Sequence, residues 1–141
     1  MEHKIILIVD DDERNIFALS AVMQHKGYFV KSALDGKSCI SILKENPNIK
    51  IVLMDIMMPI MDGYQAIKLI RADDELKQIP IIALTASTLE SDKTKCLQAG
   101  ASDFLSKPSI QPMLPPTKAI MTELAIISTT KSVGVYKSML A

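Results

Sequence analysis

The chain has 141 residues, and its 16 basic and 16 acidic side chains give a formal net charge of zero. This balance excludes the basic footprint expected of a nucleic-acid-binding domain, and the apolar runs are only strand-length, so no membrane insertion is expected. The length predicts one domain. The two cysteines lack the spacing of metal ligands and are expected to be small buried side chains. This cysteine pattern and an N-terminus unlike a signal peptide favour a cytoplasmic protein.

Short apolar runs alternate along the chain with segments of helical period. In chain order, the predicted strands cover residues 4–9, 28–33, 50–54, 80–84 and 103–106, and the predicted helices cover residues 13–26, 37–45, 63–72 and 88–99. Asp12 is expected to cap the first helix, Gly27 to end it, and residues 87–90 to form a capping box before the fourth. The alternation predicts a doubly wound parallel α/β sheet.

The sequence becomes less regular after residue 108. Pro112, Pro115 and Pro116 cannot all lie inside one helix, so a short helix is expected only from about residue 116. Residues 128–141 are rich in Ser, Thr and Lys and are expected to form a flexible tail. The predicted organisation is therefore one domain over residues 1–127, followed by a tail over residues 128–141.

Polar side chains follow four of the predicted strands. Asp10 and Asp11 follow the first strand, Asp55 the third, Thr85 the fourth and Lys107 the fifth. Because the carboxyl ends of parallel strands share one edge of a sheet, these groups are expected to gather there. Two carboxylates repel by about 4 kcal/mol at about 4 Å when the effective dielectric is near 20. A bound Mg²⁺ ion, which prefers oxygen ligands, is expected to offset this repulsion.

The same set of groups matches the requirements of phosphoryl transfer to an aspartate. A divalent cation and an ammonium group neutralise the charge spread over the phosphoryl oxygens, and a hydroxyl positions one of them. Aspartyl phosphate is a known covalent intermediate of nucleophilic catalysis. The four strand ends therefore predict a carboxylate that becomes phosphorylated.

At this point the chain resembles the receiver domain of two-component response regulators. The matching segments are ILIVDDD at residues 6–12, LMDIMMPIMDG at residues 53–63, IIALTA at residues 81–86 and AGASDFLSKP at residues 99–108. The resemblance covers residues 4–108 and implies a flavodoxin-like sheet of five parallel strands in the order 2-1-3-4-5. The irregular, proline-rich C-terminus departs from the long final helix that the family normally carries.

The resemblance implies an acceptor and a metal site. Asp55 matches the phosphoacceptor, and Asp10 and Asp11 match the acidic pair that binds Mg²⁺ together with it. The backbone carbonyl of Met57, two residues after the acceptor, would be a further metal ligand. Asp12 is an additional acid, for which the sequence favours the capping role.

The resemblance also implies a switch. Thr85 matches the switch hydroxyl, Lys107 the lysine that contacts the phosphoryl oxygens, and Phe104 the aromatic switch position. When Asp55 carries a phosphoryl group, Thr85 would move toward it and the ring of Phe104 would rotate inward. That population shift would remodel the surface formed by the fourth helix and the fifth strand.

The implied function is a phosphorylation-dependent signalling receiver. A histidine kinase or a histidine phosphotransfer protein would donate the phosphoryl group, and the switched surface would bind a partner other than nucleic acid. The domain would catalyse its own Mg²⁺-dependent phosphorylation and dephosphorylation without being a multiple-turnover enzyme. Two questions stay open: whether it forms a homodimer, and whether it is a single-domain regulator or the receiver of a hybrid histidine kinase.

Two alternative functions fit part of the pattern. Asp10 and Asp12 form the DxD pair of haloacid-dehalogenase-type phosphatases, with Thr85 and Lys107 as later motifs, although Arg14 stands where that family prefers Thr or Val. The other alternative is a phosphorylation-independent binding module with the receiver fold. A phosphatase should turn over a small phosphoester repeatedly, whereas a receiver should be modified once and discharge slowly.

Overall fold

Five parallel strands form one sheet in the computed structural model, which describes residues 5–86 and 89–106. The strands are β1 (Ile5–Val9), β2 (Phe29–Ala33), β3 (Ile49–Asp55), β4 (Ile81–Thr85) and β5 (Asp103–Ser106). The helices between them are α1 (Glu13–His25), α2 (Gly36–Glu45), α3 (Gly63–Ala72) and α4 (Glu90–Ala99). The strand order is β2-β1-β3-β4-β5, so the predicted flavodoxin-like topology is confirmed.

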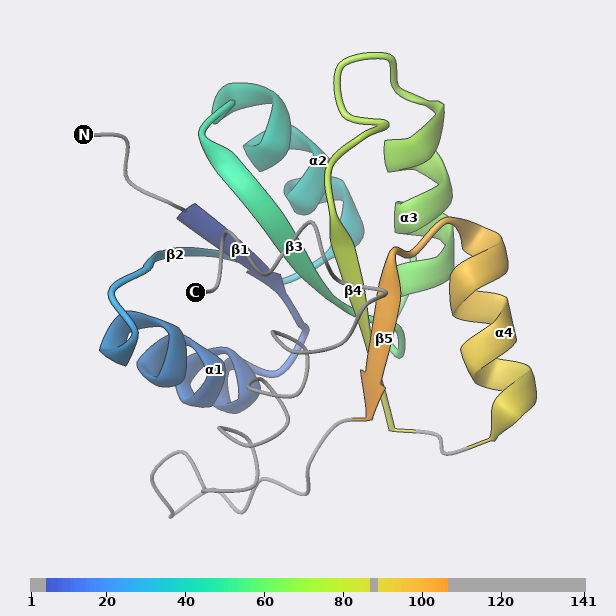
Figure 1. The fold of residues 1–141 in the computed structure, drawn as a ribbon, viewed down its shortest axis with the longest axis horizontal. Coiled ribbons are helices and arrows are strands. Elements are labelled where there is room, and N and C mark those ends of the chain that lie inside the picture. Colours follow the sequence, from blue (N-terminus) through green and yellow to red (C-terminus); the bar gives the residue numbers. More distant parts are fainter. Residues whose placement is uncertain (1–4, 87–88, 107–141) are drawn as a thin grey trace.

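Helices cover both faces of this sheet (Figure 1). Within the described ranges, α1 lies on one face, while α2, α3 and α4 lie side by side on the other. Strand β1 packs against helices on both faces of the sheet. Ile6 and Ile8 pack toward α1, whereas Leu7 and Val9 pack toward α2. Successive strand residues point to opposite faces. A strand buried on both faces is therefore apolar throughout, as this one is.

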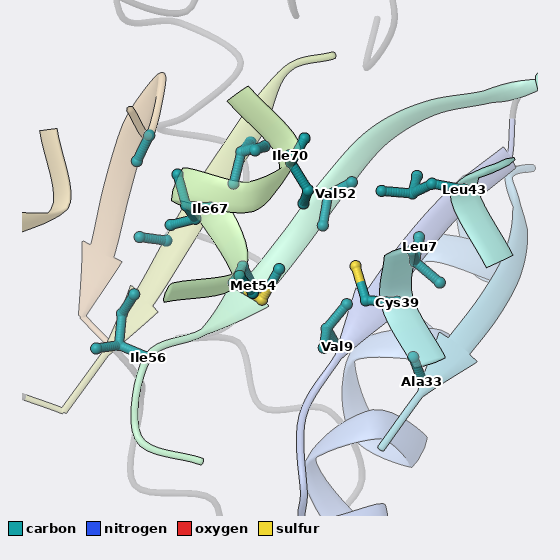
Figure 2. Close-up of a cluster of buried hydrophobic side chains, with 14 of the residues drawn as sticks. Leu7, Val9, Ala33, Cys39, Leu43, Val52, Met54, Ile56, Ile67 and Ile70 are labelled. Carbon is teal, nitrogen blue, oxygen red and sulfur yellow. The ribbon is translucent and has the colours of Figure 1, made fainter. Parts of the chain in front are cut away.

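The larger core lies between the sheet and the layer that contains α2 and α3. Figure 2 shows Cys39 of α2 near Leu7 and Val9 of β1, and Ile67 of α3 over Met54 of β3. Burial of a side chain the size of leucine or isoleucine contributes about 1.5–3 kcal/mol. Burial also raises the pKa of Cys39 to about 12, so its thiol stays protonated and acts as a small apolar side chain.

Side-chain caps fix the starts of α1 and α3. Asp12 accepts a hydrogen bond from the backbone amide two residues later, at 2.9 Å, and is confirmed as the N-cap of α1. Asp62 and Gln65 form a reciprocal capping box at the start of α3, which the sequence analysis did not identify. Gly27, with φ of 93°, follows the C-cap residue Lys26, as predicted for a helix stop.

The start of the fourth helix differs from the prediction. The predicted capping box at residues 87–90 is wrong, because α4 begins at Glu90 and its N-cap residue is Leu89, whose side chain cannot accept a hydrogen bond. The end of this helix is regular. Gly100 adopts the left-handed conformation, with φ of 117°, that glycine allows at low cost.

Two strand boundaries bear on function. The sequence analysis placed Asp55 and Thr85 just after their strands, whereas each is the last residue of its strand, Asp55 in β3 and Thr85 in β4. The sheet pairing explains this difference, because Asp55 lies in register with Leu84 and Thr85 with Ser106. Lys4, the predicted helix from about residue 116 and the predicted tail lie outside the described residues.

Arg71 of α3 fixes the loops that precede β4 and β5, at the edge where the strands begin. Its guanidinium donates hydrogen bonds to the carbonyl oxygens of Gly100 at 2.7 Å, Lys77 at 2.9 Å and Ile79 at 2.6 Å. It also donates to the hydroxyl oxygen of Ser102 at 3.2 Å. The planar fork of arginine allows one side chain to serve several acceptors.

Arg71→Lys is expected to lower the free energy of unfolding by about 1.5 kcal/mol, because one ammonium group cannot replace the whole fork. Urea unfolding followed by circular dichroism measures the change. Arg14→Lys is the matched control, since Arg14 forms an exposed ion pair with Asp12 and should cost less than about 0.5 kcal/mol. Equal losses in the two variants would contradict a specific role for Arg71.

Candidate functional site

Strands β1 and β3 bring acidic side chains together at the carboxyl edge of the sheet. Asp10 follows β1 directly and is 0% exposed, and Asp55 ends β3 and is 1% exposed. One carboxylate oxygen from each of Asp10, Asp11 and Asp55 lies within 4.8 Å of the other two. Two of these charges are buried and Asp11 is exposed, so the cluster opens to solvent on one side.

Backbone amides orient the two buried carboxylates. The amide of Asp12 donates to Oδ1 of Asp10 at 2.9 Å, and the amide of Met57 donates to Oδ1 of Asp55 at 3.3 Å. The amide of Asp10 donates in turn to the carbonyl oxygen of Ala33, at 3.1 Å. The acids are therefore held by the loops after β1 and β3, and the first of these loops is tied to the end of β2.

Asp12 has a different role from the acids beside it. Its carboxylate accepts hydrogen bonds from the backbone amide of Arg14 at 2.9 Å and from the guanidinium of the same residue at 2.9 Å and 3.1 Å. The hydrogen bond from the guanidinium to Asp12 raises the pKa of Arg14. Asp12 thus caps α1 and pairs with Arg14, outside the cluster of three acids.

Gly63 allows the loop after β3 to fold back over the end of that strand. Its amide donates to the carbonyl oxygen of Ile56 at 2.9 Å. A Cβ atom at position 63 would lie 2.4 Å from the carbonyl oxygen of Asp55 and 2.7 Å from Cα of Ile56. Only glycine fits this approach without a backbone shift. The sequence motif contains Gly63, but only the folded structure reveals this contact.

Ile60 occupies a strained and fully exposed position in the same loop. Its relative exposure is 104%. Its φ is 68°, in the left-handed region, which is unfavourable for β-branched residues. Ile60→Asn is expected to raise the free energy of unfolding by about 1 kcal/mol, because asparagine tolerates this conformation. Urea unfolding tests this. Met57→Asn also removes an exposed apolar side chain from this loop, and an equal gain there would contradict an origin in backbone strain.

The residues matched to the switch lie on β4 and β5. Thr85 is 3% exposed at the end of β4, and Phe104 is partly buried on β5, in register with Ala83. Lys93 of α4 places its Nζ 5.4 Å from the centroid of the Phe104 ring. The sequence analysis did not identify Lys93, since nothing in a local pattern links residues eleven positions apart on different elements. Lys107 lies outside the described residues.

The acidic cluster has the chemistry of a site for a hard divalent cation. Its donors are carboxylate oxygens, which suit Mg²⁺ or Ca²⁺, whereas a copper site would need thioether or imidazole ligands. A cation among Asp10, Asp11 and Asp55 would also offset their mutual repulsion. The thioether sulfur of Met57 is a soft ligand that does not suit such a cation, whereas the backbone carbonyl of this residue does. The residues present therefore fit Mg²⁺.

No helix within residues 5–86 and 89–106 is both long enough and apolar enough to span a membrane.

Comparisons with known proteins give a consistent family assignment. The family model described as the response regulator receiver domain matches residues 6–115. The two-component response regulator ORR7 of Oryza sativa subsp. japonica is 34% identical over 103 residues, which is 73% of this chain and 49% of that protein. The chain therefore spans about half the length of that relative.

Two solved structures are similar in fold and sequence. The receiver domain of the sensor histidine kinase PA1611 from Pseudomonas aeruginosa PAO1, solved with a magnesium ion coordinated in the active site cleft, aligns with a TM-score of 0.68 and 37% identity over 78% of this chain and 88% of that one. The receiver domain of Saccharomyces cerevisiae Ssk1, solved in complex with the histidine phosphotransfer protein Ypd1, aligns with a TM-score of 0.68 and 30% identity over 76% of this chain and 80% of that one.

Proposed function

Because the chain belongs to the response-regulator receiver domain family, we propose that Asp55 accepts a phosphoryl group from a histidine kinase or a histidine phosphotransfer protein. The observation that carries this proposal is the cluster of Asp10, Asp11 and Asp55 at one edge of the sheet, with carboxylate oxygens within 4.8 Å. A single buried carboxylate could be structural. Three acids at this distance repel one another, and a cation bound among them would offset that repulsion and lie beside Asp55.

The chemical step is an in-line displacement at phosphorus. A carboxylate oxygen of Asp55 forms the new O–P bond as the N–P bond of the phosphohistidine breaks, and the imidazole leaves with the bonding electron pair. The amide of Met57, which donates to Oδ1 of Asp55 at 3.3 Å, orients the nucleophile. Asp10, Asp11, Asp55 and the carbonyl of Met57 would hold Mg²⁺, which supplies charge neutralisation at the phosphoryl oxygens when bound.

Three further residues complete the proposed site. The hydroxyl of Thr85 donates a hydrogen bond to one phosphoryl oxygen, and the ammonium group of Lys107 neutralises another. Movement of Thr85 toward the phosphoryl group leaves space into which the ring of Phe104 turns. The phosphorylated domain then offers a changed surface at α4 and β5 to its downstream partner.

The structure weighs against the phosphatase alternative. A haloacid-dehalogenase-type mechanism would need Asp12 in the pocket beside Asp10, but Asp12 caps α1 and pairs with Arg14. A phosphorylation-independent binding module would have no need for Asp10, Asp11 and Asp55 as a repulsive cluster.

Intact-mass measurement after incubation with acetyl phosphate and Mg²⁺ tests the proposed function. Wild type should gain one phosphoryl group, and Asp55→Ala, or wild type without the metal, should gain none. Asp74→Asn is the matched control, because its side chain is 95% exposed and belongs to the loop after α3. Failure of wild type to form the adduct, together with failure to bind beryllofluoride, would support the binding-module alternative instead.

A further inference from the structure

Helix α4 is held to the sheet by little apolar burial. Its buried residues are Cys96 and Ala99, both small. Helix α3 has the same length and buries Ile67 and Ile70 in addition to smaller residues. Because stabilisation scales with the apolar area removed from water, other contacts have more influence on the position of α4 than on that of α3.

One such contact joins α4 to β5. The ammonium group of Lys93 lies 5.4 Å from the centroid of the Phe104 ring, within the distance of about 6 Å at which a cation is attracted to an aromatic face. The side chain of Lys93 is only 24% exposed, and its Nζ lies 3.8 Å from a carboxylate oxygen of Glu90, one turn earlier. Partial burial strengthens the cation–π contact, and the ammonium group makes both contacts in this structure.

The chemical identity of residue 104 makes this contact important. Phenylalanine has no hydroxyl with which to hydrogen-bond in either position of the ring. Apart from packing, the ring can be held through its face or its edge, and a cation is the side-chain partner suited to the face. Lys93 therefore orients a ring that has no hydrogen-bonding group of its own.

We propose that Lys93 is a positioning residue of the switch, which holds the ring of Phe104 in the position that it has in this structure, where Asp55 carries no phosphoryl group. This inference rests on the proposed function, because the inward turn of the ring is part of that proposal. A contact made in only one of two states biases their equilibrium by its own free energy. The contact between Lys93 and Phe104 thus opposes activation, and its release also frees a positive charge at the surface of α4 and β5.

The test measures the affinity for beryllofluoride in Mg²⁺ by isothermal titration calorimetry. Lys93→Met, which keeps the length and removes the charge, should bind about two- to fivefold more tightly than wild type. Lys93→Arg should stay close to wild type, since a guanidinium also stacks on aromatic faces. Lys95→Met removes the same charge from an exposed position on α4 and should leave the affinity unchanged.

A double-mutant cycle with Phe104→Leu separates positioning from a general effect on the helix. Once the ring is absent, Lys93→Met should produce no further change in affinity. Equal tightening in the Phe104→Leu background, or equal tightening by Lys95→Met, would overturn the proposal. So would unchanged affinity in the Lys93→Met single variant.

A ring measurement on the unphosphorylated protein distinguishes failure of this inference from failure of the proposed function. With ¹³C-labelled phenylalanine, the ring resonances of Phe104, assigned from the spectrum of Phe104→Leu, should shift in Lys93→Met and stay near their wild-type positions in Lys95→Met. Unchanged resonances in Lys93→Met would overturn the contact itself. Wild type that fails to bind beryllofluoride would overturn the proposed function, and with it the role of the contact in switching.

Discussion

Asp10→Asn is expected to make the protein more stable than wild type without Mg²⁺ and less stable than wild type with it. In the absence of metal, the substitution removes one of three carboxylate charges that lie within 4.8 Å of one another. Repulsion of about 4 kcal/mol per pair at an effective dielectric near 20 is an upper figure. Because Asp11 is exposed and its charge is screened, we expect a gain of about 2 kcal/mol in the free energy of unfolding.

The packing at Asp10 favours a clean substitution. Its Oδ1 accepts a hydrogen bond from the amide of Asp12, and the side-chain oxygen of asparagine can accept the same bond. Asparagine also has nearly the volume of aspartate, so the buried position need not expand. The change in stability should therefore report the loss of charge rather than a cavity or a lost cap.

Magnesium should reverse the order of the two proteins. Metal that binds only the folded state stabilises it by about 2.7 kcal/mol at about one hundred times its Kd. Wild type should show this gain, and Asp10→Asn, which lacks one acidic ligand, should show little of it. Urea unfolding with Mg²⁺ and with EDTA gives the free energies of unfolding of both proteins in both conditions. Asp74→Asn, a substitution at a side chain that is 95% exposed, should follow wild type in both conditions. A variant that is destabilised in EDTA would contradict the repulsive cluster.

Much of this site could be predicted because its chemistry lies at strand ends. Asp10 and Asp55 each follow or end an apolar run, and parallel strands bring their ends to one edge, so a local pattern was enough to predict that the two acids would meet. The strand order was not available from periodicity, which repeats identically in every βα unit. It followed from the family resemblance instead.

The contacts that the sequence could not reveal are those that depend on register and side-chain direction. Arg71 bonds to the carbonyl of Gly100, 29 residues away, and Lys93 meets Phe104 across two elements. Neither contact leaves a periodic signal. The helix caps could be predicted only in part. Asp12 is the N-cap of α1, as predicted. The pattern at residues 87–90 does not form a capping box, because α4 begins later than its helix propensity suggests.

Gly63→Ala is expected to lower the free energy of unfolding by about 3 kcal/mol, at the upper end of the cost of overpacking. Helix propensity predicts the opposite sign, because position 63 is the first residue of α3 and alanine is favoured over glycine in helices by up to about 1 kcal/mol. Steric conflict should prevail here. The new Cβ atom would lie 2.4 Å from the carbonyl oxygen of Asp55, a backbone atom that cannot move away as a flexible side chain could.

The same displacement should reach the acceptor. Because Asp55 must shift to admit the methyl group, phosphorylation by acetyl phosphate should slow by about ten- to hundredfold, as expected when a reacting group is misplaced by a fraction of an ångström to one ångström. Gly27→Ala is the matched control, since position 27 has φ of 93° but a methyl carbon there would meet no atom within 4 Å. It should cost about 1 kcal/mol through backbone strain alone and leave the rate unchanged. Gly63→Ala with wild-type stability would show that the loop after β3 yields more easily than its contacts with Asp55 and Ile56 imply.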